Sequence, residues 1–240
     1  MLQMSLVGLA LACLMSFAAT PSLAGAPASE DKALTARQQA IVLIGAFTAQ
    51  GNLESLRIAL AEGLDAGLTV NEIKEILVQL YAYAGFPRSL NAINTFMDVL
   101  QARRDKGIPD AVGKEPSPLS ADKSTLELGT EIQTQLVGAP VKGAIYDFAP
   151  AIDTFLKAHL FGDIFGRDNL DFASREIATI AALSSMQGVN PQLRSHFKAG
   201  MRVGLDAQQL TSLIGVLETR VGQKEADNAA VVLRDVLDGK

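Results

Sequence analysis

Hydrophobic positions recur with a helical period along most of this chain. The clearest apolar stripe has residues spaced i, i+3, i+4, i+7 and i+11, namely Ile73, Ile76, Leu77, Leu80 and Ala84. Thr69 and Glu72 have the spacing of a capping box at the start of this helix, and Gly67 is placed to end the helix before it. No stretch shows the sustained alternation of apolar and polar residues that predicts strands. The pattern therefore predicts an all-α fold.

The same pattern occurs twice in the chain. Residues 34–100, moved forward by 137 positions, align with residues 171–237 without a gap, and 15 of the 67 pairs are identical. Several of these identities are glycines, which mark backbone geometry that a side chain would obstruct. We therefore expect two repeats of one fold, packed about a pseudo-twofold axis.

Each copy is predicted to form four helices. In the first copy they span about residues 36–49, 53–66, 70–84 and 88–106, and their counterparts lie 137 residues later. Residues 107–122 are rich in Pro, Gly, Ser and charge, which is typical of a linker. Two more helices, near 123–136 and 149–165, precede the second copy only. The expected organisation is a first repeat over 34–106, the linker, and a more complete second repeat over 123–238.

The N-terminal residues 1–24 have the composition of a secretory signal peptide. An apolar run from Leu6 to Ala19 is too short to span a bilayer comfortably. Ser22 and Ala24 then provide small residues at the −3 and −1 positions of a cleavage site after Ala24. A retained membrane anchor is the alternative. We expect cleavage, and hence a periplasmic or secreted protein with no membrane contact after processing.

Composition excludes several classes of site. The single cysteine, Cys13, lies in the predicted signal peptide, so the mature chain has no disulfide, catalytic thiolate or cysteine-ligated metal. A net charge of −5 with mixed acids and bases argues against nucleic acid as a partner. Two histidines, His159 and His196, are too few for a histidine-based metal cluster. Neither a metal nor a cofactor is therefore expected.

Three stretches of the sequence resemble one protein family. They are FLKAHLFGDIFGRDNLDFASREIATIAAL (155–183), PQLRSHFKAGMRVGL (191–205) and LVQLYAYAGFPRSLNA (77–92). Together they are similar to the carboxymuconolactone decarboxylase family, which belongs to the alkylhydroperoxidase D-like superfamily. The resemblance implies tandem alkylhydroperoxidase D-like helical repeats. Because single-repeat relatives often form rings of six subunits, it also implies a homotrimer of this two-repeat chain.

Glu176 and His196 are the leading candidates for catalytic residues. The turn between their helices lies near residues 187–188, so antiparallel packing brings the two side chains to a similar height. A carboxylate beside an imidazole fixes its tautomer, which suits proton transfer. The alternative is a buried hydrogen bond that only joins two helices. In the gapless alignment the first copy has Gln39 and Ala59 at these positions, and therefore lacks the pair.

Arg175 and Arg194 flank the pair on the same two helices and are candidate clamps for a substrate carboxylate. In the peroxidase branch of the superfamily, two cysteines precede the matching histidine. The corresponding positions of this chain are Val189 and Gln192. A cysteine-dependent peroxidase or peroxiredoxin activity is therefore disfavoured, although the scaffold is shared.

A Tyr-Ala-Tyr-Ala-Gly-Phe-Pro segment predicts a sharp corner between two helices of the first copy. Gly85 would end one helix and Pro87 would start the next. Phe86 is expected to fill the core. Tyr81 and Tyr83 are candidate substrate-binding residues, because a buried tyrosine hydroxyl needs a polar partner.

These features predict acid–base chemistry, decarboxylation or isomerisation, on a small carboxylated lactone or related organic acid. The alternative is a non-catalytic binding or assembly protein on the same scaffold, since the family often has a histidine where this chain has Gln79. We expect one pocket per chain, formed by Glu176 and His196. Tyr81 and Tyr83 of the first repeat would complete it, from the same chain or from a neighbour.

Overall fold

The structure is a computed structural model that describes residues 33–239. Within that range the regular secondary structure is helical, with no β-strand, so the all-α prediction is confirmed. None of the helices in this range combines the length and the apolar character needed to cross a bilayer. The predicted signal peptide, residues 1–24, lies outside the described residues and stays a prediction.

The first repeat forms its four helices within about two residues of the predicted bounds. They are α1 (Ala36–Gln50), α2 (Leu53–Asp65), α3 (Val70–Ala84) and α4 (Phe86–Asp105). Thr69 and Glu72 make the predicted capping box at the start of α3. Gly85 lies between α3 and α4 with φ at 84°, a left-handed value that favours glycine, and this produces the predicted corner.

The second repeat forms the equivalent four helices. They are α8 (Phe172–Ser184), α9 (Asn190–Arg202), α10 (Ala207–Arg220) and α11 (Gln223–Leu237). Asp206 and Gln209 make a capping box at the start of α10, at the positions that match the box of α3. The same local interactions therefore start the same helix in both repeats.

The segment before the second repeat is more broken than the sequence predicts. After α5 (Thr125–Val137) come α6 (Ala144–Phe148), α7 (Pro150–Thr154) and the π-helix η1 (Phe155–Ile164). The single helix expected over 149–165 is therefore wrong in part. Ala149 leaves the helical region with φ at −131° and ψ at 73°, as expected of a residue that precedes a proline.

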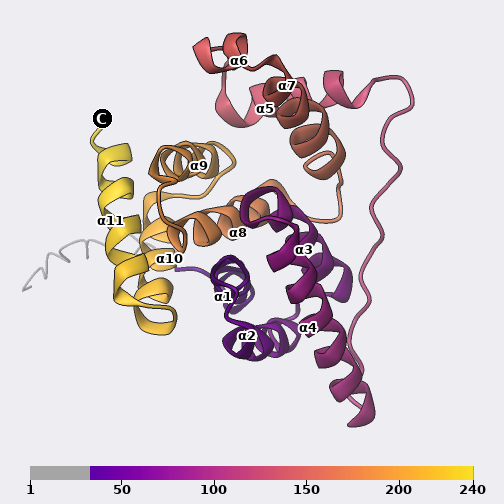
Figure 1. Cartoon of the computed structure of the whole chain (residues 1–240). Helices are drawn as coiled ribbons and strands as arrows, with labels where there is room; N and C mark the ends of the chain where they lie inside the picture. Colours follow the sequence, from indigo (N-terminus) through magenta and orange to yellow (C-terminus); the bar gives the residue numbers. More distant parts are fainter. Residues whose placement is uncertain (1–32, 240) are drawn as a thin grey trace, which may run out of the picture. The chain divides into compact units, whose positions relative to one another are not determined.

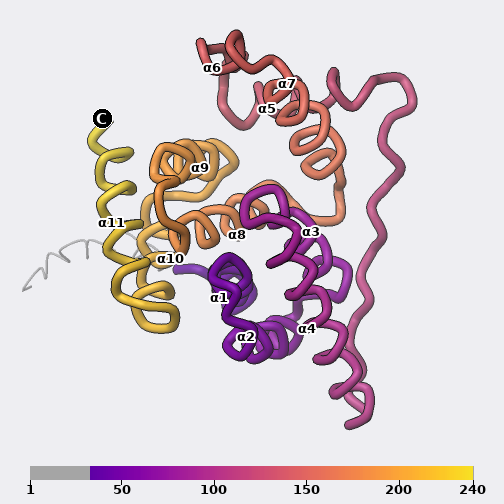
Figure 2. The backbone as a smooth tube through the Cα atoms, in the orientation of Figure 1, coloured from indigo at the N-terminus to yellow at the C-terminus, as the bar shows by residue number. Residues whose placement is uncertain are grey.

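Residues 107–122 contain no helix, as expected of a linker, and connect α4 to α5 as an extended segment (Figure 2). They are nevertheless fastened to the start of α3. The backbone N–H of Val70 donates to the Ala111 carbonyl at 2.9 Å, and that of Asn71 donates to the Val112 carbonyl at 2.9 Å. The predicted repeat boundaries on either side of this segment stay predictions.

The two repeats share one core, centred on the contact between α1 and α8 (Figure 1). The backbones of α1 and α8 approach closely at Gly45. A Cβ at this position would lie 2.6 Å from the Ala178 carbonyl oxygen, so the contact requires glycine. Helix α3 packs on α8 and, equivalently, α10 packs on α1, which is the relation of a pseudo-twofold axis. A second apolar group, the η1 cluster, consists of Ile132, Leu136, Leu160, Phe161, Ile164, Phe165 and Ala199.

The gapless alignment of the two repeats is wrong by one residue at α1 and α8. Gly63 faces Leu68 and Ala40, whereas Gly200 faces Leu205 and Glu176. The residue equivalent to Glu176 is therefore Ala40. The shift arises because the connection from α8 to α9 spans residues 185–189, which is longer than the connection between α1 and α2. The first repeat still lacks the acid and the histidine.

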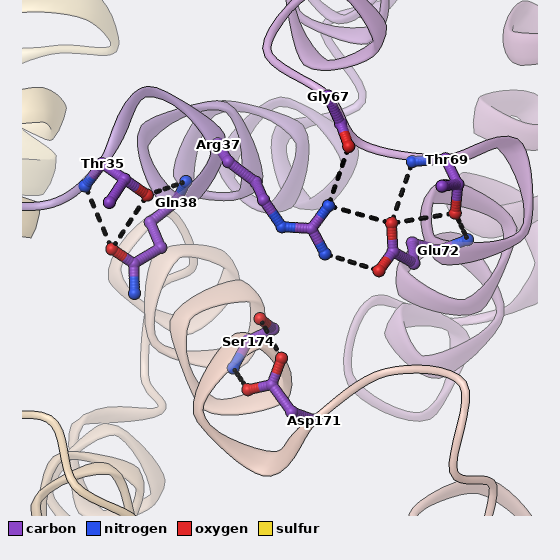
Figure 3. A network of polar contacts seen from close by, with 8 residues as sticks. All are labelled: Thr35, Arg37, Gln38, Gly67, Thr69, Glu72, Asp171 and Ser174. Atoms are coloured by element: carbon purple, nitrogen blue, oxygen red, sulfur yellow. Dashed lines mark hydrogen bonds and ion pairs between the residues drawn. The ribbon is translucent and has the colours of Figure 1, made fainter. Parts of the chain in front are cut away.

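The starts of α1, α3 and α8 meet in a polar network (Figure 3). Arg37 on α1 donates to both carboxylate oxygens of Glu72 and to the Gly67 carbonyl. The Asp171 carboxylate, which caps α8 through the Ser174 N–H, adds to the field that raises the pKa of Arg37, after the larger effect of Glu72. The dashed contacts in Figure 3 lie within each repeat, and Asp171 of the second repeat acts on Arg37 of the first through its charge.

Candidate active site

Glu176 on α8 and His196 on α9 form a close pair between neighbouring helices. His196 Nδ1 lies 2.7 Å from Glu176 Oε2. The Glu176 side chain is 1% exposed and the His196 side chain is 15% exposed. The structure thus brings together the two residues that the turn spacing predicted. The carboxylate orients the ring and leaves Nε2 as the nitrogen available to another molecule.

Tyr83 comes from α3 of the first repeat and reaches the same place. Its ring stands edge-on to the His196 ring, with centroids 5.4 Å apart and an interplanar angle of 77°. Burial raises the pKa of Tyr83 well above its ordinary value, and the Glu176 carboxylate raises it further. The opposing effects of Thr179 and Arg175 are smaller. Tyr83 is therefore a neutral hydroxyl, able to donate a hydrogen bond at physiological pH.

Unpartnered polar atoms gather around this pair. Within the described residues, the Tyr83 hydroxyl, Glu176 Oε1 and Arg175 Nε are buried and have no hydrogen-bond partner. Glu176 and Arg175 both act on the pKa of Tyr83, so the three side chains lie within electrostatic reach of one another. Buried polar atoms in proteins are nearly always paired. Three exceptions on neighbouring side chains make this place a candidate site for a polar molecule.

Arg175 is fully buried, and most of its guanidinium is occupied. Its NH1 group donates to Gln79 Oε1 at 2.9 Å, and its NH2 group donates to Glu75 Oε1 at 3.0 Å and to the Arg167 carbonyl at 2.7 Å. Its guanidinium carbon lies 5.5 Å from the centre of the Phe165 ring. Burial lowers the pKa of Arg175 against the opposing effect of Glu75. Nε is the one guanidinium nitrogen of Arg175 that has no partner among the described residues, and it is therefore a candidate donor to a substrate carboxylate.

Arg194 makes a salt bridge that occurs in both repeats. Its NH2 group lies 2.9 Å from Asp235 and links α9 to α11. Arg57 and Asp98 form the equivalent bridge at 3.1 Å and link α2 to α4. Because the first repeat keeps this bridge without any acid–histidine pair, the bridge has a structural role that does not depend on the site.

Tyr81 does not join Tyr83 at the buried pair. Its ring stacks on Phe86 at 4.2 Å and contacts the His159 ring at 5.7 Å. Phe86, expected in the core, is 61% exposed, because it begins α4 and packs against Tyr81 instead. Both tyrosines of the corner pack against the η1 cluster, but Tyr83 contacts His196 whereas Tyr81 contacts Phe86 and His159.

The sequence reasoning did not identify Glu75 and Gln79 as parts of the site. Gln79 Nε2 donates to the Thr179 hydroxyl at 2.8 Å and to the Arg175 carbonyl at 3.0 Å. The sequence did contain an indication of their role, because Glu75 and Gln79 are polar residues four apart beside the predicted apolar stripe of α3. The structure shows that both are buried. Polar side chains at buried helix positions require partners, and here the partners belong to the other repeat.

Two surface cavities of about 400 Å³ each lie elsewhere. One is lined by residues 184–188 with Asn190, Lys224, Glu225 and Asn228, and the other by Gln135, Asp171, Phe172, Ala173, Arg202 and Val203. Neither cavity includes Glu176, His196 or Tyr83. Among the described residues there is also no group of three or more potential metal ligands. The candidate site is therefore a largely buried arrangement of an acid, an imidazole and a phenol.

The sequence of this site and its scaffold matches a known family. A model of the carboxymuconolactone decarboxylase family matches residues 16–96 and 150–235. The chain belongs to the carboxymuconolactone decarboxylase family. Each matched segment covers most of one repeat, so this member carries the family unit twice. The acid and the histidine lie in the second segment, and Tyr83 lies in the first.

A curated relative is similar over part of the chain. Peroxisomal protein 2 of Saccharomyces cerevisiae is 26% identical over 166 residues, which cover 60% of this chain and 59% of the yeast protein. This carboxymuconolactone decarboxylase family member therefore spans less than two thirds of the yeast relative.

Proposed function

We propose that this chain is an enzyme that performs acid–base chemistry on a small organic acid or carboxylated lactone. The observation that carries the proposal is the 2.7 Å Glu176–His196 pair with the unpartnered Tyr83 hydroxyl and Glu176 Oε1 beside it. Membership of the carboxymuconolactone decarboxylase family supports the substrate class. The three side chains supply a proton carrier, its orienting carboxylate and a neutral hydrogen-bond donor.

Each side chain has one task in this proposal. Glu176 accepts from His196 Nδ1 and stabilises the imidazolium, and His196 Nε2 carries the transferred proton. The Tyr83 hydroxyl donates a hydrogen bond to the substrate oxygen that becomes negative, and its raised pKa keeps the phenol protonated. The unpartnered Arg175 Nε is the group left to hold the substrate carboxylate.

Two reactions fit these tasks. In a decarboxylation, the bond between the carboxylate and its neighbouring carbon breaks, carbon dioxide leaves, and the electron pair moves into an enolate. The enolate oxygen accepts the hydrogen bond from Tyr83, and His196 then gives its proton to carbon. In an isomerisation, His196 removes a proton from one carbon and returns it to another. Burial of the pair keeps water away from the enolate in both cases.

The test is turnover by the purified chain with a panel of unsaturated lactone acids. His196→Gln and Glu176→Gln keep the size of the side chains, and Glu218→Gln is the control at an exposed carboxylate outside the site. We expect a loss of roughly a hundredfold to ten-thousandfold in kcat for His196→Gln, and none for the control. Equal turnover by wild type and His196→Gln would remove His196 from the mechanism.

A non-catalytic binding or assembly protein is the second candidate. Two observations favour it: the buried Glu176 joins α8 to α9 through His196, and Arg175 is occupied by contacts that link the second repeat to α3 of the first. In that case Glu176→Gln lowers the free energy of unfolding by about 1–3 kcal/mol while no member of the lactone panel is turned over by the wild type.

The proposed setting is export and assembly as a ring. We propose cleavage after Ala24 and a periplasmic or secreted mature protein, which N-terminal sequencing of the protein from its host would test by a first residue of Gly25. An intact N-terminus would refute the cleavage. We also propose a homotrimer, in which three two-repeat chains take the place of six single-repeat subunits.

A further inference from the structure

His159 lies on the surface and has the same kind of neighbours as His196 of the buried Glu176–His196 pair. His159 Nδ1 lies 2.7 Å from Asp163 Oδ2, and the His159 ring contacts Tyr81 with centroids 5.7 Å apart. The chain has two histidines, and both are therefore held by a carboxylate and flanked by a tyrosine from the last turn of α3. The difference lies in access, because the His159 and Asp163 side chains are 49% and 45% exposed.

An aromatic surface adjoins this imidazole. The rings of Tyr81 and Phe86 are nearly parallel, with centroids 4.2 Å apart and an interplanar angle of 16°. More than half of Phe86 is exposed, so part of the stacked pair is open to solvent. A planar ligand can extend this stack, because offset-stacked aromatic rings attract one another beyond the effect of burial alone.

The corner of the second repeat carries no aromatic residues at the equivalent positions. Glu218 and Gln223 occupy the positions equivalent to Tyr81 and Phe86, at the corner between α10 and α11. That corner also begins its second helix after a glycine, Gly222. The aromatic pair is therefore a property of the first corner only, where it lies against the His159 ring.

The position of His159 is fixed by close helix packing. His159 and Asp163 lie on the π-helix η1, a rare form that occurs frequently at functional sites. Helix η1 packs against α5 at two glycines. A Cβ on Gly129 would lie 1.7 Å from the Lys157 carbonyl oxygen, and a Cβ on Gly162 would lie 2.2 Å from the Thr125 carbonyl oxygen. Such packing fixes the backbone of η1, and Asp163 and Tyr81 then contact the imidazole of His159.

We propose that His159, Asp163, Tyr81 and Phe86 form a surface binding site for a planar aromatic carboxylate. Because Nδ1 faces Asp163, Nε2 is the nitrogen that faces a ligand, and the imidazolium donates a hydrogen bond from it. The ligand carboxylate accepts this bond, and its ring stacks on the aromatic pair. The proposal does not depend on the reaction at His196, since it concerns binding to a different histidine.

The experiment is a titration of the full, ¹⁵N-labelled chain with benzoate, followed by the NMR signals of the histidine side chains. With two histidines in the chain, the signals that disappear in His159→Gln identify His159. We expect the His159 signals to shift saturably with a millimolar Kd while the His196 signals stay in place. Cyclohexanecarboxylate, which has the same charge without a planar ring, is expected to bind roughly two- to tenfold more weakly.

Two further measurements separate the ring from the carboxylate. Phe86→Gln copies the residue of the equivalent corner, so the fold tolerates it, and it should weaken benzoate binding by roughly two- to tenfold. Benzyl alcohol should bind more weakly than benzoate to wild type, but equally to His159→Gln when followed by the Tyr81 ring signals. The proposal is overturned if benzoate leaves the His159 signals unchanged, shifts the His196 signals instead, or binds wild type and Phe86→Gln equally.

Discussion

The Tyr83 ring stands edge-on to the His196 ring, with centroids 5.4 Å apart, and this contact joins the two repeats at one site. Tyr83 lies on α3 of the first repeat and His196 on α9 of the second. The positions equivalent to them about the pseudo-twofold axis are Arg220 and Ala59. Arg220 forms an exposed salt bridge with Glu62 at 2.9 Å. The equivalent place about the pseudo-twofold axis therefore lacks both the tyrosine and the histidine, which supports one site per chain.

Tyr83→Phe should separate stability from function. The variant removes a buried hydroxyl that has no partner, so the free energy of unfolding should stay equal or rise by up to about 1 kcal/mol. If the hydroxyl supports the proposed enolate, kcat should fall by roughly a hundredfold. Urea unfolding and turnover on the lactone panel measure the two effects.

The double variant Tyr83→Phe/His196→Gln is the control for this prediction. Because both residues are proposed to act on one substrate, their effects on kcat should not be additive. Additive losses, or a Tyr83→Phe variant that is less stable by more than about 1 kcal/mol, would assign the hydroxyl to packing rather than to the site.

The helices were predictable because their ends depend on local interactions. The capping boxes at Thr69 and Asp206 each join residues three apart in the sequence, and Gly85 marks a left-handed corner. The meeting of Glu176 and His196 was predictable for the same reason, since one short connection separates their helices. Interactions between residues that are close in the sequence can be recognised from the spacing of the residue types alone.

Contacts between the repeats could not be predicted in this way. Glu75 and Arg175 are 100 residues apart, and their contact depends on how α3 lies on α8. The one-residue shift of α8 depends on the length of the following connection, which an alignment without gaps conceals. The π-helix packs against α5 at Gly129 and Gly162, and the period of its apolar residues does not reveal this close contact.

Glu75 should be among the residues on which stability depends most. Its carboxylate is 2% exposed and accepts from Arg175, whose side chain is wholly buried, and from Arg167. Glu75→Ala leaves the Arg175 charge buried without its main partner, so we expect a loss of about 3–5 kcal/mol in the free energy of unfolding, measured in urea.

An exposed pair and a double replacement serve as controls for Glu75. Asp98→Asn breaks the solvent-exposed bridge to Arg57 and should cost less than about 1 kcal/mol. The double variant Glu75→Gln/Arg175→Met removes both charges and should recover much of the stability lost in Glu75→Ala. If Glu75→Ala and Asp98→Asn cost the same, the buried network contributes no more than a surface pair.

The Glu72–Arg37 pair should make stability depend on pH in the acid range. Burial alone would raise the pKa of Glu72, but hydrogen bonds from Arg37 and Thr69 outweigh it and lower the pKa in the folded state. The unfolded chain therefore binds more protons than the folded chain in this range. The stabilisation is complete above the ordinary pKa of 4.5 and is lost as the pH falls through the lowered value.

Glu72→Gln is the variant that tests this dependence. It copies Gln209, the residue at the same position of the capping box in the second repeat, so the helix keeps its start. The wild type should be more stable than the variant at about pH 6, and the difference should shrink as the pH approaches about 3. A difference that is independent of pH would show that the carboxylate is not the stabilising group.

The proposed trimer can be tested on the outer face of α4. Leu90 and Met97 are 55% and 63% exposed there, whereas the equivalent positions of α11 carry Asp227 and Arg234. An apolar face that only one repeat exposes suits contact with another copy of the chain. Light scattering at micromolar concentration should give the mass of three chains. Leu90→Asp/Met97→Arg, which copies the second repeat, should release monomers with unchanged helical content. A wild type that is a stable monomer would refute the trimer, and a trimer that survives the double substitution would place its interface elsewhere.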